Sequence, residues 1–197
     1  MLEHLRMLAR YNKWANAQLN TAVMNISHDA YMAKREAFFG SIHGGLNHIL
    51  LIDRIWRGRV EGNPHPADRL DIIVTDDREA FLRERMAEDD ILIDFTDSFD
   101  EKSLDEKVTY SSLIGFTGTD PRRLILAHMF NHATHHRGQI HALLTQVPAD
   151  HFDLQIVGWL CQRYAGRHGV MSDSFDKLIR VFKRLTWVDG LVFLSLD

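Results

Sequence analysis

NHATHHRGQIH, residues 131–141, places four histidines within eleven residues. An α-helix turns by about 100° per residue, so side chains four positions apart lie on one face, one turn apart. On a helix through this stretch, His132 and His136 fall within or beside the apolar face, and His135 falls at its edge. The pattern therefore predicts a helix that presents an inward pair of imidazoles, a common way for one helix to supply two metal ligands.

Two imidazoles rarely make a tight metal site, so we expect a third ligand from another helix. The apolar segment 38–60 contains two histidines: His48 lies on the flank of its apolar face, and His43 lies nearly opposite. His48 is therefore the better third ligand. Three imidazoles leave coordination positions open for water or substrate, as in catalytic zinc sites. All-nitrogen ligation suits zinc, nickel, iron or copper and does not choose between them.

The same histidines have a second interpretation, as hydrogen-bonded polar residues in a helical core. A histidine on an apolar face is usually such a residue, and the spacing alone leaves both interpretations open. A zinc metalloprotease is not indicated, because its motif has a glutamate after the first histidine and Ala133 holds that place here.

The composition limits the class of protein. The chain has 197 residues, 45% of them hydrophobic and 25% charged, which is enough for one domain with a proper core. A net charge of -4 without any basic run gives no indication of nucleic-acid binding. With no membrane-length apolar run and no secretory pattern at the N-terminus, we expect a cytoplasmic protein without a membrane partner. The single cysteine, Cys161, excludes a disulfide within the chain.

The period of the apolar residues and the scarcity of proline predict long helices. They are expected over residues 2–26, 38–60, 76–100 and 121–146. Asp76 or Asp77 is expected to cap the third, and Asp120 the fourth, with Pro121 in its first helical position. Residues 102–120 have no helical period and predict an irregular crossover, with room for a short hairpin near the mouth of the site.

The C-terminal part is harder to interpret. A shorter helix is expected over about residues 153–164, and residues 173–185 are amphipathic enough for another. The last stretch, 185–197, is either a strand or a docked extension. We therefore divide the chain into a helical bundle over residues 1–165 and an extension of uncertain structure over residues 166–197.

Three segments together resemble the DinB/YfiT-like superfamily of metal-dependent proteins. They are YNKWAN (residues 11–16), NHILLIDRIW (residues 47–56) and NHATHHRGQIHALL (residues 131–144), and the likeness covers roughly residues 1–165. The resemblance implies an all-α four-helix bundle with a long irregular crossover before the ligand helix. It also implies a homodimer and a divalent metal, zinc or nickel foremost and iron as a third option, bound by His48, His132 and His136.

Relatives in that superfamily include thiol-dependent transferases and isomerases. The resemblance therefore implies a metal-dependent enzyme that activates a low-molecular-weight thiol, as a thiol S-transferase does. With water as the nucleophile, the same site would act as a hydrolase. The alternative is a non-enzymatic, metal-binding stress-response dimer. The sequence identifies no catalytic base.

Three further residues are candidates for supporting roles. Gln139 lies near the histidine edge of its helix and could contact substrate or water. His135 is either a proton shuttle or a solvent-facing neighbour, and we favour the neighbour. Asp53 lies about 140° around its helix from His48. We favour a structural role for it, pairing with Asn12 or Trp14, over one as a general base or as support for a metal ligand.

Overall fold

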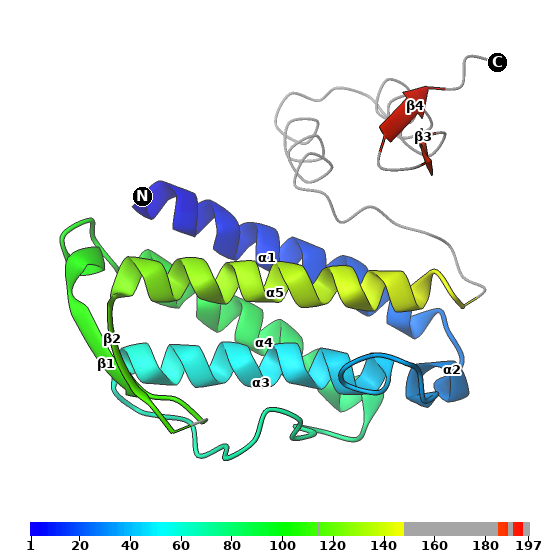
Figure 1. The fold of residues 1–197 in the computed structure, drawn as a ribbon, viewed down its shortest axis with the longest axis horizontal. Coiled ribbons are helices and arrows are strands. Elements are labelled where there is room, and N and C mark those ends of the chain that lie inside the picture. Colours follow the sequence, from blue (N-terminus) through cyan, green and yellow to red (C-terminus); the bar gives the residue numbers. More distant parts are fainter. Residues whose placement is uncertain (114, 148–184, 189–190, 195–197) are drawn as a thin grey trace. The chain divides into compact units, whose positions relative to one another are not determined.

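A computed structural model describes residues 1–113, 115–147, 185–188 and 191–194 (Figure 1). The chain divides into two units, Met1–Asp153 and Leu154–Asp197. Within its described part, the first unit is an all-α bundle with a small hairpin, as predicted. Its long helices are α1 (Leu2–Met24), α3 (Ile42–Glu61), α4 (Arg78–Asp97) and α5 (Arg122–Leu144), with a short α2 (His28–Met32) between the first two.

The ends of these helices follow from local side chains. Ser41 precedes α3, and its hydroxyl accepts a hydrogen bond from the Gly44 N–H at 2.9 Å. Asp77 caps α4 in the same way through the Ala80 N–H at 2.6 Å, which confirms one of the two predicted caps. Helix α3 stops at Gly62, whose φ of 72° is the left-handed conformation that glycine adopts without strain.

The predicted cap of α5 is wrong. Asp120 belongs to strand β2 (Thr117–Pro121), which pairs antiparallel with β1 (Lys107–Ser111), with Val108 opposite Asp120. The pairing holds the chain extended as far as Pro121, which becomes the N-cap of α5 without a side-chain hydrogen bond. The Asp120 carboxylate instead accepts a hydrogen bond from the Tyr110 hydroxyl at 2.8 Å. The segment predicted to be irregular thus holds a hairpin, preceded by the 3₁₀ turn η1 (Ser103–Asp105).

Polar contacts between helices show the relative directions of the helices. Arg10 of α1 pairs with Asp97 of α4 at 2.7 Å, and Asn16 contacts Asp89 at 2.8 Å, so these two helices are antiparallel. Helices α3 and α4 are parallel, so residues 62–77 must return along the bundle between them, as Figure 1 shows. Helix α5 packs antiparallel against α3, and this pair carries the site described below.

An apolar cluster and a buried polar network share the interior. The apolar cluster joins α1, α4 and α5 through side chains that include Leu5, Leu92, Phe95, Leu126 and Met129. Removing such side chains from water stabilises the fold by about 1.5–3 kcal/mol each. They account for the predicted helical period, because each lies on the inward face of its helix.

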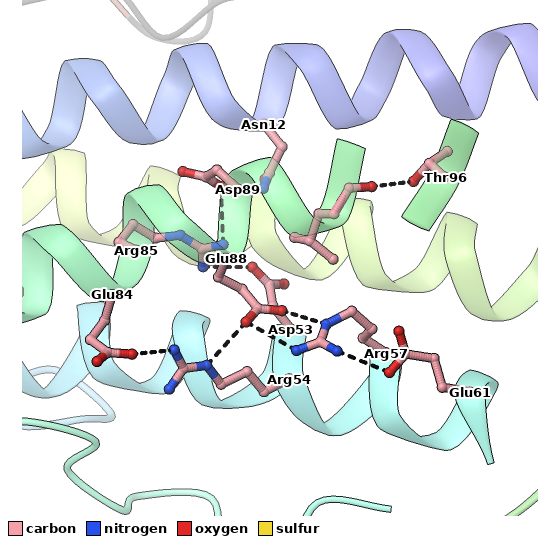
Figure 2. Close-up of polar contacts among 11 residues, drawn as sticks. Asn12, Asp53, Arg54, Arg57, Glu61, Glu84, Arg85, Glu88, Asp89 and Thr96 are labelled. Atoms are coloured by element: carbon pink, nitrogen blue, oxygen red, sulfur yellow. Dashed lines mark hydrogen bonds and ion pairs between the residues drawn. The ribbon is translucent and has the colours of Figure 1, made fainter. Parts of the chain in front are cut away.

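The polar network lies between α3 and α4 (Figure 2). The Arg85 guanidinium contacts the Asp53 carboxylate at 2.7 Å and the Asp89 carboxylate at 3.0 Å, and all three side chains are at most 2% exposed. Burial and the Asp89 charge raise the pKa of Asp53 to about 6, although Arg85 opposes the shift. Next to them, Glu88 accepts hydrogen bonds from Arg54 and Arg57.

In the second unit, strands β3 (Leu185–Val188) and β4 (Leu191–Leu194) form an antiparallel pair. The helices predicted over residues 153–164 and 173–185 lie outside the described residues, except for residue 185. The proposed division at residue 165 stays a prediction. In the described ranges, no helix is both long and apolar enough to cross a membrane.

Candidate metal centre

Helices α3 and α5 approach closely because a glycine lies at their contact. A Cβ added to Gly45 would lie 2.3 Å from Cδ1 of Ile140, far inside van der Waals contact. A larger residue at this position would fit only if the end of the Ile140 side chain moved away. One turn further along α3, His48 faces His132 and His136 of α5.

The three imidazoles converge. Nε2 of His48 lies 3.2 Å from Nε2 of His132, and one ring nitrogen from each of His48, His132 and His136 lies within 4.8 Å of the other two. A tetrahedral ion with metal–nitrogen bonds of about 2.0–2.1 Å needs nitrogens roughly 3.3 Å apart. The His48–His132 pair already has this spacing, and small side-chain rotations would bring the third nitrogen to it.

Hydrogen bonds fix which ring nitrogen keeps a lone pair in His48 and in His136. Nδ1 of His48 lies 2.8 Å from the Leu70 carbonyl oxygen, and Nδ1 of His136 lies 2.8 Å from Oε1 of Gln139. Both oxygens only accept, so each Nδ1 carries the hydrogen and each Nε2 of these neutral rings keeps its lone pair. Metal-binding histidines typically have such an outer hydrogen bond.

The third imidazole, that of His132, is also placed to bind a cation. Nδ1 of His132 is buried and has no hydrogen-bond partner in the described part of the chain. Its Nε2 faces the lone pair of His48, so a proton or a cation must lie between the two nitrogens. The donor set therefore fits a cation, and neutral nitrogen ligands of this kind suit transition metals.

Burial keeps these imidazoles neutral. It lowers the pKa of His48 to about 4, with the charge of His136 as a smaller contribution and the Leu70 hydrogen bond opposing. Burial lowers the pKa of His132 to about 3, helped by the neighbouring histidines. Burial also lowers the pKa of His136, against the hydrogen bond to Gln139. At neutral pH the cluster is therefore in the form that binds metal without first losing a proton.

The cluster forms part of the wall of a pocket of about 450 Å³. One face of α3, with Ile52, Ile55 and Trp56, supplies its apolar floor. The Phe39 ring stacks on the His48 imidazole, with 3.7 Å between centroids and 20° between planes. Beside it, Phe38 is 87% exposed at the rim. The volume is that of a small-molecule site.

The structure separates the supporting candidates. Gln139 and His135 line the pocket, and the Gln139 amide nitrogen contacts Nε2 of His135 at 3.1 Å. Asp53 does not line it and pairs with Arg85 instead. Phe116, from the hairpin segment predicted near the mouth of the site, is part of the pocket wall.

Among the pocket residues to which the sequence analysis gave no role, two have a recognisable spacing. Arg59 follows His48 by eleven residues, which returns it to the same face of α3, and His128 precedes His132 by one turn. A search for apolar faces does not single out either. Phe39 lies within the range 38–60 that was expected to be helical, but α3 begins only at Ile42, so the helical period does not hold for it.

The sequence was compared with models of protein families. Residues 1–150 match the sequence model described as DinB family, which is most of the chain. No similar sequence is found among curated proteins. The match and the three-histidine group are both compatible with a metal-binding protein.

Proposed function

The chain belongs to the DinB family, and on that premise we propose that it is a metal-dependent enzyme that activates a small nucleophile. His48, His132 and His136 would hold one divalent transition-metal ion, with zinc or nickel as the first choices. The nucleophile is a low-molecular-weight thiol, which makes the reaction a transfer of the thiol sulfur to an electrophile. Water in its place makes the reaction a hydrolysis.

One observation carries the proposal: three neutral imidazoles converge from two helices on the wall of a small-molecule pocket. A site closed by a fourth protein ligand would be structural. Among the described residues, the metal-binding group contains these three histidines and no fourth His, Cys, Asp or Glu. That composition favours an open position for a reactant.

A divalent metal bound there would supply Lewis acidity, which lowers the pKa of a thiol or water at the open position. The other contributions come from the protein. The Leu70 carbonyl and Gln139 hold His48 and His136 in the tautomer that carries its hydrogen on Nδ1 and keeps a lone pair on Nε2. The stacked Phe39 ring and the apolar floor keep water away from the imidazoles, which strengthens electrostatic interactions within the site.

His128 is placed to accept the proton that the nucleophile releases. It lines the same pocket, and its ring centroid lies 5.9 Å from that of His132. Burial, and then the charge of Arg59, lower its pKa, so an imidazole nitrogen is available as a proton acceptor at neutral pH. In thiol transfer, the sulfur–carbon bond forms as the leaving group departs, and His128 takes the thiol proton.

The test is a substrate screen on protein loaded with zinc or with nickel. One panel pairs low-molecular-weight thiols with an aryl halide, and a second contains esters, amides and lactones. We expect turnover in one panel, at least tenfold lower after His132→Ala and unchanged after His4→Ala, which alters an exposed histidine far along the chain. Turnover that survives complete metal removal would contradict the proposal.

A further inference from the structure

The pocket continues past the histidines to Arg59, in the last turn of α3. A second hollow of about 390 Å³ shares part of the wall there. The two hollows have these residues in common: Trp56, Arg59, Ser112, Phe116 and His128. The Arg59 guanidinium lies over the ring of Trp56, which is eight residues beyond His48, so this end of the pocket lies roughly 12 Å from the histidines along the helix axis.

The Arg59 guanidinium is held in place by rings and by one carbonyl. Its Cζ lies 4.4 Å from the centroid of Trp56 and 5.4 Å from that of Tyr110. One of its N–H groups donates to the Ser111 carbonyl oxygen at 2.9 Å. Stacking of this kind leaves the edge of the guanidinium available for a planar, two-oxygen acceptor.

No carboxylate among the described residues pairs with Arg59. Asp120, an acid on the wall of the second hollow, accepts a hydrogen bond from the Tyr110 hydroxyl at 2.8 Å. Burial lowers the pKa of Arg59, and the opposing contribution comes from Tyr110. By contrast, Arg57, two residues earlier and outside the pocket, binds both Glu61 and Glu88. A half-buried cation without a counter-ion, on the wall of a pocket, is a ready anion site.

The surroundings favour a single negative charge. Arg59 lies at the C-terminal end of α3, where the helix dipole is negative, and Asp120 adds a further negative charge nearby. The negative end of the helix dipole and the Asp120 charge would both repel a phosphate dianion. A carboxylate carries one charge and matches the two-pronged guanidinium.

We propose that Arg59 binds the carboxylate of an extended small-molecule substrate whose other end reacts at the three histidines. The apolar floor formed by Ile52, Ile55 and Trp56 contacts the chain between the two ends. The assignment of the reacting end to the three histidines rests on the proposed function, whereas the assignment of the carboxylate site to Arg59 does not. The substrate class is therefore a carboxylate-bearing molecule that spans about 12 Å.

The first experiment uses metal-free protein, so it is independent of the metal. Calorimetric titration compares octanoate with octanamide, which has the same chain without the charge. We expect the wild type to bind octanoate about tenfold more tightly, the gain expected of one charge-assisted contact. Arg59→Gln should abolish this preference, and Arg59→Lys should keep part of it. Arg83→Gln, at an exposed arginine outside the pocket, should retain it fully.

The second experiment uses metal-loaded protein and a series of ω-mercaptoalkanoic acids of increasing length. Affinity should peak at the length that spans about 12 Å, and the peak should disappear in Arg59→Gln. An equal affinity of the wild type for octanoate and octanamide would overturn the proposal, as would a carboxylate preference that persists in Arg59→Gln. If the wild type showed the carboxylate preference but did not bind zinc or nickel, the proposed function alone would be refuted.

Discussion

Replacing Phe39 by alanine should make metal binding far more sensitive to acid. The Phe39 ring covers one face of the His48 imidazole at 3.7 Å, so its removal admits water to the cluster. Water relieves the desolvation that lowers the histidine pKa values, which should then rise toward 6.5. Protons compete with the metal for each imidazole, so a higher pKa means that metal is released at higher pH.

The wild-type response can be worked out from the pKa values. Three ordinary imidazoles with pKa near 6.5 are each protonated about ten parts in eleven at about pH 5.5, which weakens metal binding about a thousandfold relative to about pH 8. With His48 at about 4 and His132 at about 3, neither is appreciably protonated at that pH. Only His136 is left to compete, so the wild type should lose no more than about tenfold.

Equilibrium dialysis against buffered zinc, with mass-spectrometric metal analysis of both compartments, measures these affinities. Phe39→Ala should match the wild type within a few fold at about pH 8 and lose at least tenfold more than it by about pH 5.5. Phe38→Ala is the matched control, because Phe38 lies at the same rim but is 87% exposed. A wild type that itself loses about a thousandfold would refute the reasoning, as would identical profiles for the two variants.

Two predictions concern the helix packing that supports the site. Arg85→Met leaves Asp53 and Asp89 buried without their shared cation, so urea unfolding should show a loss of about 3–5 kcal/mol at high pH. Arg85 holds down the pKa of Asp53, which is about 6 in the wild type, so in the variant Asp53 takes up its proton at higher pH and the loss should shrink as the pH falls toward about 6. A loss under about 1 kcal/mol at high pH would contradict the role given to the network. Gly45→Ala should destabilise the protein by about 1–3 kcal/mol and weaken metal binding, because the new Cβ pushes on Cδ1 of Ile140. Adding Ile140→Val removes that atom and should restore most of both losses, and no recovery would mean that the contact is not responsible.

The sequence predicted the helices and the three histidines because both depend on the period of one helix at a time. Residues such as Leu5 in α1 and Met129 in α5 repeat on the inward face of their own helix, and His132 and His136 lie within or beside that face of α5 with the spacing of one turn. His48 followed from its position on the flank of the other apolar face. The family resemblance led to the same three residues.

Features that depend on contacts between elements could not be predicted in this way. Asp120 has the chemistry of a helix cap, but pairing with β1 draws it into a strand, and a single-helix rule cannot detect this. The outer hydrogen bond of His48 goes to Leu70, in a loop whose path the sequence does not specify. Asp53 was expected to pair with Asn12 or Trp14, yet it pairs with Arg85, from a helix parallel to its own.

The metal content of the three single-histidine variants tests the account most directly. Protein purified without a metal-affinity tag, loaded with zinc and then dialysed, should hold about one ion per chain by elemental analysis. His48→Ala, His132→Ala and His136→Ala should each lose it, while His4→Ala keeps it. If each of the three variants retained a full equivalent of metal, these imidazoles would not be the ligands, and the proposed chemistry would lose its basis.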